Sequence, residues 1–273
     1  MKKLGLISGM GELPMAIAAE ASSKGYSVFA VGLAQLADPA LESFVHELRM
    51  INVGKLGEVI DYLKKSGVKE VVMAGKVPKA LLYKSKISPD LRAIRLLFSL
   101  KDRSDDSIML GIAKELKKDG IILLNTTDFS TQLLTPEGVL TVNRPSDEDW
   151  KDIIFGWKIA KEMGRLDIGQ TVVIKNQAVM AVEAIEGTDE AIRRGGRLGG
   201  GGAVVVKVSK PQQDMRFDVP VVGLETLRTM REAEATVLAV EAEKSILLGR
   251  ERLLKEANAA GISVVGFTDN APL

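Results

Sequence analysis

The densest group of chemically useful side chains lies in one short segment, KPQQDMRFDVP, at residues 210–220. If this segment is extended, Asp214, Arg216 and Asp218 share one face, because alternate side chains of a strand point the same way. Two carboxylates and a guanidinium are costly to bury without a ligand or partners. Such a face could hold Mg²⁺ through a carboxylate and a phosphate through the arginine or a lysine. The alternative interpretation is an exposed edge strand.

Glycine turns follow two apolar runs in the N-terminal half. Gly9-Met10-Gly11 comes after residues 3–8, and Gly75-Lys76 comes after residues 70–74. Because ligands of open α/β sheets bind outside the carboxyl ends of the strands, both turns are candidate phosphate contacts. The first turn lacks the third glycine of a dinucleotide fingerprint, and no acidic residue ends the next strand, which argues against NAD. The alternatives are a plain tight turn and a turn with a solvated lysine.

A third cluster, EAIEGTD, runs from Glu183 to Asp189. Its last four residues, EGTD at 186–189, supply a carboxylate, a flexible backbone, a hydroxyl and a second carboxylate. This combination suits a loop that binds hydroxyl groups or a metal. The alternative is a capping loop before a helix, with Thr188 or Asp189 as the N-cap.

A fourth cluster is the tetrapeptide RSDD at residues 103–106. Ser104 and the two aspartates favour a cap for the helix that follows. The alternative is a polar contact from these residues to a ligand.

The composition limits which groups can do chemistry. The 273 residues include no cysteine and one histidine, His46, which excludes disulfides, cysteine nucleophiles and zinc sites built from cysteines or histidine clusters. Carboxylates must therefore carry any metal and general-base chemistry. A net charge of +1 and 4% aromatic residues argue against nucleic-acid binding. No apolar run approaches the roughly 20 residues of a membrane span, and we expect a soluble, intracellular protein.

Strands and helices alternate in the first half of the chain. Apolar runs predict strands, and positions spaced three and four apart predict helices. The expected strands are 3–8, 26–33, 70–74 and 121–125, and the expected helices follow the first glycine turn and span 56–66, 92–100 and 106–118. This alternation predicts an α/β fold with an open sheet in an N-terminal domain at residues 1–134.

The second half of the chain has a different pattern of apolar residues. A linker is expected at 135–147, with Ser146 suited to begin a helix that runs to about residue 163. We then expect a hairpin about 175–177, a flexible glycine run at 193–202, a strand at 203–209, a helix at 224–234, a strand at 235–238, a helix within 241–261 and a strand at 262–267. These elements predict a distinct α/β domain at residues 148–273.

A resemblance extends along nearly the whole chain. It is carried by KLGLISGMGELP, VVMAGKV, GRLDIGQTVV, VMAVEAIEGTDEAIRR and KPQQDMRFDVPVVGLET. The sequence resembles the UDP-2,3-diacylglucosamine pyrophosphatase family of lipid A biosynthesis, the type unrelated to calcineurin-like metallophosphoesterases. The resemblance implies a Rossmann-like N-terminal domain and a distinct catalytic C-terminal domain, with substrate held between them. It also implies Mg²⁺-dependent hydrolysis to UMP and 2,3-diacylglucosamine 1-phosphate (lipid X).

The resemblance also implies roles for individual residues. The family's critical aspartate falls in the motif R-x-D-x-P, which makes Asp218 the candidate catalytic residue. From the chemistry of diphosphate hydrolysis we hypothesise that Asp218 holds Mg²⁺ or orients the water, assisted by Glu186 or Asp189, with Asp189 as the second candidate metal ligand. Lys210 and Lys76 would neutralise phosphate. The candidate substrate-binding residues are Ser8, Gly9, Gly11, Gly75, Lys76, Asp105, Gln170, Glu186, Gly187, Thr188, Lys210 and Gln213.

The implied substrate is a lipid with two acyl chains. An apolar groove, a cytoplasmic location and peripheral contact with the inner membrane are therefore expected, and a homodimer stays open. Two other functions also stay open: another nucleotide-sugar or NAD-dependent enzyme, and a non-catalytic protein that binds nucleotides or lipids.

Overall fold

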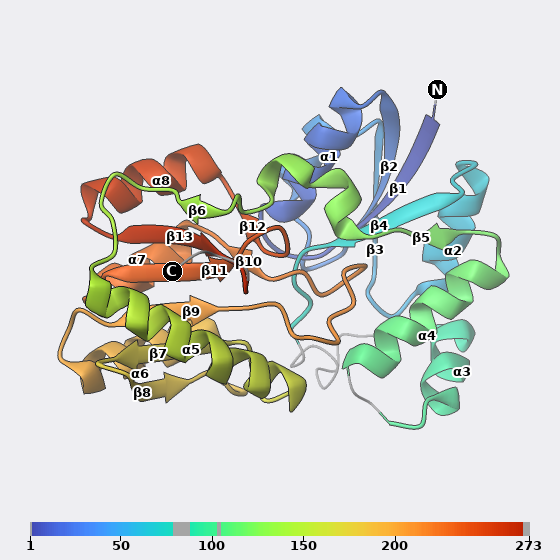
Figure 1. Cartoon of the computed structure of the whole chain (residues 1–273). Coiled ribbons are helices and arrows are strands. Elements are labelled where there is room, and N and C mark those ends of the chain that lie inside the picture. The colour runs from blue at the N-terminus through green and yellow to red at the C-terminus, as the bar shows by residue number, and fades with distance from the viewer. Residues whose placement is uncertain (1, 79–87, 103–104, 270–273) are drawn as a thin grey trace. The chain divides into compact units, whose positions relative to one another are not determined.

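A computed structural model describes residues 2–78, 88–102 and 105–269, and the chain divides into two units (Figure 1). The N-terminal unit comprises residues 1–130 together with 215–217, and the C-terminal unit comprises residues 131–214 and 218–273. Each unit has its own sheet and its own hydrophobic core. Among the described helices, none has both the length and the apolar character needed to cross a membrane.

The N-terminal unit contains a five-stranded parallel sheet in the order β3-β2-β1-β4-β5. Its strands are β1 (Lys2–Ser8), β2 (Tyr26–Leu33), β3 (Glu47–Ile51), β4 (Glu70–Ala74) and β5 (Ile122–Leu123). The central strands are continuous apolar runs because helices cover both faces of the sheet. The predicted Rossmann-like open sheet is confirmed.

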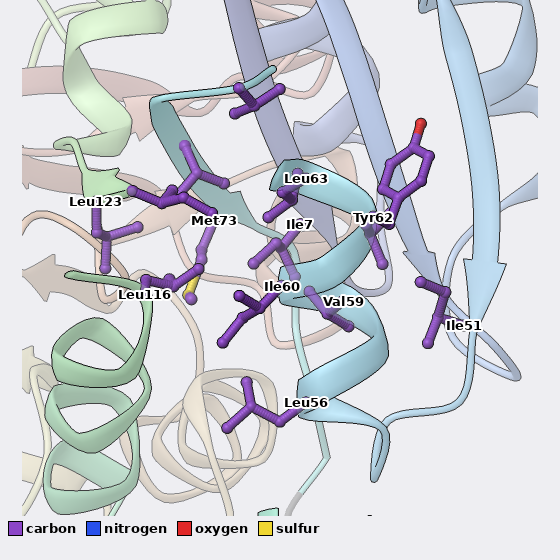
Figure 2. Close-up of a cluster of buried hydrophobic side chains, with 14 of the residues drawn as sticks. Ile7, Ile51, Leu56, Val59, Ile60, Tyr62, Leu63, Met73, Leu116 and Leu123 are labelled. Atoms are coloured by element: carbon purple, nitrogen blue, oxygen red, sulfur yellow. The ribbon is translucent and has the colours of Figure 1, made fainter. Parts of the chain in front are cut away.

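Helices cover the two faces of this sheet. They are α1 (Leu13–Ser23), α2 (Leu56–Lys65), α3 (Leu91–Ser99) and α4 (Asp105–Lys118), with the short 3₁₀ segments η1 (Pro39–Phe44) and η3 (Thr126–Phe129). Figure 2 shows Ile60 and Leu63 of α2 beside Ile7 of β1, within a cluster that also includes residues of α3 and α4. Helix α1 contacts β1, β2 and β4 outside this cluster.

The C-terminal unit contains a six-stranded mixed sheet in the order β6-β13-β11-β9-β7-β8. Its strands are β6 (Gly138–Val139), β7 (Thr171–Lys175), β8 (Ala178–Val182), β9 (Val204–Lys207), β11 (Val237–Glu241) and β13 (Ser263–Phe267). Strands β9, β11 and β13 are parallel, whereas β6, β7 and β8 join antiparallel. The predicted hairpin is confirmed: Asn176 and Gln177 form its turn with φ of 51° and 55°, as a type I′ connection requires.

Smaller elements complete this unit. A two-stranded parallel pair joins β10 (Val221–Val222) to β12 (Ile246–Leu247), and η4 spans Thr131–Leu133. The helices are α5 (Asp147–Arg165), α6 (Thr188–Gly199), α7 (Leu224–Glu232) and α8 (Arg250–Ala259). Because strand side chains alternate, Val172 and Val206 pack with α5, whereas Val173 and Val205 pack with the cluster of α6, α7 and α8.

Helix α5 begins as the sequence predicts. Ser146 is its N-cap: the Ser146 side chain accepts from the backbone N–H of Asp149, and the Asp149 side chain accepts from the backbone N–H of Ser146. This reciprocal capping box satisfies two backbone donors at the start of the helix.

Two predicted features of this unit are wrong. The glycine run is not a flexible loop, because its residues 193–199 form the second half of α6. A Cβ on Gly195 would lie 2.5 Å from Val173 Cβ, and one on Gly196 would lie 2.2 Å from the carbonyl oxygen of Ala233. These glycines therefore let α6 approach β7 and the end of α7 closely. Within 241–261, only residues 250–259 are helical, because β12 occupies 246–247.

Candidate functional site

The two glycine turns of the N-terminal unit meet at the carboxyl ends of β1 and β4. The Gly9 N–H donates to the Ala74 carbonyl at 2.8 Å, and the backbones of Met10 and Lys76 exchange two hydrogen bonds of 2.9 Å. A Cβ on Gly9 would lie 2.6 Å from the Lys76 carbonyl oxygen, and Gly75 has a φ of +90°. Both glycines are therefore required by the close backbone approach.

This pairing limits what the turns can bind. The backbone N–H groups of Gly9 and Met10 are already engaged, and Pro14 in the first turn of α1 has no N–H. Ser8 is buried, and its hydroxyl donates to the Gly9 carbonyl at 3.2 Å. These two amides are thus not available to a phosphate, as they would be in a dinucleotide fingerprint. Gly11, Gly75 and Lys76 are exposed and keep their place as candidate contacts.

The RSDD cluster is only partly visible. Arg103 and Ser104 lie outside the described residues, so the predicted serine cap is not observed. Asp105, a candidate substrate contact, is the first residue of α4.

The segment at 210–220 is not extended. The Gln213 N–H donates to the Lys210 carbonyl at 3.0 Å, and the Asp218 N–H donates to the Asp214 carbonyl at 3.0 Å, so the segment is a succession of turns. Pro211 stands at the second position of the first turn, where its fixed φ is favourable. The prediction of one shared polar face, and the alternative of an edge strand, are both wrong.

Three residues in the middle of this segment belong to the N-terminal unit. The Thr126 N–H donates to the Met215 carbonyl at 3.0 Å, the Thr126 hydroxyl donates to the Arg216 carbonyl at 3.1 Å, and Phe217 packs against the core of that unit. Asp214 and Asp218, on either side, are grouped with the C-terminal unit. These backbone contacts explain why side-chain alternation fails across the segment.

The structure brings together three of the predicted residues, Lys210, Gln213 and Asp218. The Gln213 amide nitrogen donates to Asp218 Oδ2 at 2.7 Å. Its amide oxygen accepts from the Lys210 N–H at 2.6 Å and from the Ser209 hydroxyl at 3.1 Å. Asp218 is half-buried and its carboxylate is held in one orientation.

Lys210 points its ammonium at a neighbouring carboxylate. Its Nζ lies 2.6 Å from Asp167 Oδ1, and the Asp167 side chain is 65% exposed. An ion pair with so exposed a partner is weak, about 0–1 kcal/mol. A phosphate group could therefore replace Asp167 at little cost.

A buried carboxylate and a half-buried ammonium beside this segment were not predicted. Glu241 ends β11, and Lys161 lies on α5; their side chains are 2.5 Å apart and 5% and 20% exposed. Glu241 Oε2 also accepts from the Ser209 N–H at 2.7 Å, and Lys161 Nζ donates to the Ser209 carbonyl at 3.0 Å. The only signal in the sequence was a carboxylate at the end of the apolar run VLAVE.

A second polar group lies where α6 begins. The Thr188 hydroxyl donates to Glu183 Oε1 at 2.9 Å and accepts from Lys207 Nζ, at the end of β9, at 3.0 Å. Glu183 is 9% exposed and Lys207 is 6% exposed. The N-cap of α6 is Gly187 without a side-chain bond, so the predicted capping by Thr188 or Asp189 is wrong. The sequence did not single out Lys207.

The remaining predicted residues surround this group. Glu186 binds Arg194 at 2.5 Å, and hydrogen bonds from its own backbone N–H and from Arg194 lower the pKa of its carboxyl. Gln170 Oε1 and Asp189 Oδ1 are buried oxygens that have no hydrogen-bond partner among the residues that the structure describes. Buried acceptors of this kind call for a water, an ion or a ligand group.

A metal centre built from protein groups alone is not seen. Residues 2–78, 88–102 and 105–269 contain no group of three or more His, Cys, Asp or Glu side chains placed to hold a metal. The carboxylates of Asp218 and Asp189 are thus not part of such a group.

Two surface hollows lie elsewhere. One of about 450 Å³ is lined by residues that include Arg49, Tyr62 and Arg92, and one of about 440 Å³ by residues that include Arg193 and Glu232. Burial, followed by the charge of Glu47, raises the pKa of Tyr62 to about 12. Neither hollow contains a predicted site residue.

Comparisons with known proteins cover both units. The family description "LpxI N-terminal domain" matches residues 3–133, and "LpxI C-terminal domain" matches residues 136–265. A UDP-2,3-diacylglucosamine pyrophosphatase LpxI of Caulobacter vibrioides is 31% identical over 277 residues, covering 97% of this chain and 98% of that protein.

Solved structures are much less similar. The crystal structure of gox2253 is 11% identical, with a TM-score of 0.33, over 99% of this chain and 91% of that one. An N5-carboxyaminoimidazole ribonucleotide synthetase from Thermotoga maritima is 17% identical, with a TM-score of 0.24, over 68% of this chain and 42% of that one. At these TM-scores the solved structures contribute nothing to the argument.

Proposed function

The chain belongs to the LpxI family, and we propose from this membership that it hydrolyses the diphosphate of UDP-2,3-diacylglucosamine in lipid A biosynthesis. The products would be UMP and 2,3-diacylglucosamine 1-phosphate. One observation carries the proposal: a pyrophosphatase named for this substrate is 31% identical over 97% of the chain. The alignment covers 97% of the chain and so spans both units.

We assign the central role to Asp218. In the reaction, a water oxygen forms a bond to one phosphorus atom while the bond from that phosphorus to the bridging oxygen breaks. The protons of the water pass to the solvent, and the departing phosphate keeps the bonding electrons. A carboxylate at fixed orientation can accept a hydrogen bond from that water and align it. The hydrogen bond of 2.7 Å from Gln213 gives Asp218 such a fixed orientation.

We further propose that Mg²⁺ acts in this reaction. When bound, the ion neutralises charge on the diphosphate oxygens. Mg²⁺ is usually held by one or two carboxylates together with substrate phosphates and waters. The described residues hold no cluster of three ligands, so a site shared by Asp218 and the diphosphate fits this donor set. The buried Asp189 Oδ1, which has no hydrogen-bond partner within the described part of the chain, is the second candidate oxygen.

Lys210 is the proposed phosphate contact in the C-terminal unit. Its ammonium is 2.6 Å from a carboxylate on the surface, so the position already attracts the opposite charge. Exchange of Asp167 for a substrate phosphate would keep the ammonium paired. Lys76 and Gly11 are the proposed exposed contacts of the N-terminal unit.

Membrane contact and self-association are proposals from the resemblance alone. A substrate with two acyl chains resides in a bilayer, so the enzyme would bind the inner membrane peripherally. Flotation with phospholipid vesicles tests this contact, and sedimentation equilibrium tests the homodimer. A protein that stays at the bottom of the gradient, or sediments as a monomer, would contradict the respective proposal.

The central test is UMP release from purified UDP-2,3-diacylglucosamine, with Mg²⁺ and with EDTA. We expect release with Mg²⁺, loss with EDTA, and a fall of at least about 100-fold in Asp218→Asn. Asp147→Asn is the matched control, because Asp147 is an exposed carboxylate in the first turn of α5. Substrate binding without release would favour the non-catalytic alternative, and NADH binding would favour a dehydrogenase.

A further inference from the structure

The Asp218 carboxylate is the last member of a hydrogen-bonded relay that begins in the protein interior. The relay runs from the Lys161–Glu241 ion pair to Ser209, then to Gln213, and ends at Asp218. Lys161 Nζ lies 2.5 Å from Glu241 Oε2, which accepts from the Ser209 N–H at 2.7 Å. The Ser209 hydroxyl donates to Gln213 Oε1 at 3.1 Å, and Gln213 Nε2 donates to Asp218 Oδ2 at 2.7 Å. All five residues belong to the C-terminal unit.

The first step of the relay fixes Ser209. Glu241 Oε2 accepts from its N–H, and Lys161 Nζ donates to its carbonyl oxygen, so the ion pair binds both polar backbone groups of one residue. Ser209 is 3% exposed, and the Glu241 side chain is 5% exposed. Because these groups are shielded from water, their hydrogen bonds hold the serine in one position.

The second step fixes the amide of Gln213. Its oxygen accepts from the Ser209 hydroxyl and the Lys210 N–H, two donors. A flipped amide would place its NH₂ group against those donors, so only one orientation is satisfied. That orientation aims the NH₂ group at Asp218 Oδ2.

Removing the Glu241 carboxylate from water is costly, since its side chain is 5% exposed, and this makes its location informative. Well-packed apolar side chains of similar volume often stabilise a fold as well as a buried ion pair does. Lys161 and Glu241 bind Ser209, the first residue of the segment 209–218 that ends in the proposed catalytic carboxylate. We propose that Glu241, paired with Lys161, is a positioning residue that orients Asp218 through Ser209 and Gln213. This inference rests on the proposed function of Asp218.

The main variant removes both charges together, so that no unpaired ion stays buried. In Lys161→Met/Glu241→Leu we expect kcat to fall about 10- to 100-fold while KM changes less than about threefold. Lys161→Met/Glu241→Gln restores an acceptor for the Ser209 N–H and should recover much of the loss.

The matched control is Asp152→Asn. Asp152 is a buried carboxylate of α5 that accepts from the N–H groups of Asn176 and Gln177 and holds the β7–β8 turn. It resembles Glu241 in burial and in binding backbone, but it has no place in the relay. The kcat of Asp152→Asn should stay within about twofold of the wild-type value.

A double-mutant cycle separates positioning from general destabilisation. If the relay acts through Gln213, the main variant should lower kcat by less than about twofold when introduced into Gln213→Ala. An unchanged kcat in the main variant, or a full additive loss in the Gln213→Ala background, would overturn the proposal. If the main variant does not fold, Ser209→Ala breaks the same relay by removing one hydroxyl, and the same cycle applies.

Amide hydrogen exchange provides a readout that needs no activity. We expect faster exchange in residues 209–218 of the main variant, and no change there in Asp152→Asn. A wild-type protein that releases no UMP would refute the proposed function, and the exchange data would still decide whether the relay holds the segment. Unchanged exchange at 209–218 would refute the relay itself.

Discussion

The side-chain amide of Gln213 donates a hydrogen bond of 2.7 Å to Asp218 Oδ2, across a backbone turn in which the Asp218 N–H binds the Asp214 carbonyl. The side chain and the backbone thus fix the same residue from two directions. An aspartate without these bonds would sample several rotamers. If the reaction needs one of them, ordering the side chain would raise the activation free energy of each turnover. Gln213 therefore acts on the orientation of the carboxylate.

The first prediction concerns this amide. A hydrogen bond to a charged group is worth about 1.5–3 kcal/mol, which corresponds to roughly a 10- to 100-fold change in rate if it is needed in the transition state. Gln213→Ala should lower kcat by that factor in a UMP-release assay, and Gln213→Glu should lower it further because two carboxylates would face each other. An active Gln213→Glu enzyme would contradict the assigned role.

The second prediction concerns Lys210 and its partner Asp167. Lys210→Met removes the proposed phosphate contact and should raise KM by about tenfold or more. Asp167→Asn removes only the competing carboxylate, so its KM should stay the same or fall. Asp167 has a φ of 57°, a conformation that asparagine also tolerates. A rise in KM in both variants would show that the ion pair matters for structure and not for substrate.

The third prediction concerns the glycines of α6. Gly196→Ala places a Cβ only 2.2 Å from the Ala233 carbonyl oxygen, so α6 and the end of α7 must separate. Such overpacking costs about 1–3 kcal/mol. Gly199→Ala is the control in the same helix, because its nearest contact would be the flexible Met180 side chain at 3.3 Å. Urea unfolding followed by tryptophan fluorescence reports on this unit, since Trp150 and Trp157 both lie on α5. Equal stability of the two variants would contradict the packing role.

Much of the fold could be predicted because its cause is local. Strands buried on both faces read as apolar runs, and β2 and β4 match the residues expected, 26–33 and 70–74. The prediction of a flexible glycine run was wrong because glycine content alone does not measure flexibility. The reason for Gly195 and Gly196 is close packing against Val173 and Ala233, which lie elsewhere in the chain.

The site was harder to predict than the fold. The pattern at 210–220 alternates like a strand. The backbone turns instead, because the Gln213 N–H binds the Lys210 carbonyl and the Gln213 side chain accepts from the Lys210 N–H, and alternation does not reveal such bonds. Lys161 and Glu241 are 80 residues apart, and neither stands in a motif. Such a pair becomes visible only when α5 is packed on the sheet that contains β11.

The fourth prediction concerns acid stability of the N-terminal unit. Arg92 on α3 binds Glu115 at 2.7 Å and Asp119 at 2.5 Å, and Lys64 on α2 binds Asp119 at 2.6 Å. A hydrogen bond from Lys118, then from Arg92, lowers the pKa of Glu115. Hydrogen bonds from Lys64 and then Arg92 lower the pKa of Asp119.

Because both carboxyls have a lower pKa folded than unfolded, their contribution is present above about pH 4–4.5 and is lost as the pH falls through the folded values. Glu115→Gln/Asp119→Asn should therefore lower the free energy of unfolding of α4 by about 1–2 kcal/mol near neutral pH. This gap between the variant and the wild type should become smaller below about pH 4. Hydrogen exchange of the α4 amides, corrected for the intrinsic effect of pH, measures this gap within the unit concerned. Glu148→Gln is the control, since its partner Lys151 is 3.9 Å away and the Glu148 side chain is 77% exposed. A gap that stays constant with pH would mean that the two carboxylates contribute through packing, because packing does not depend on their ionisation.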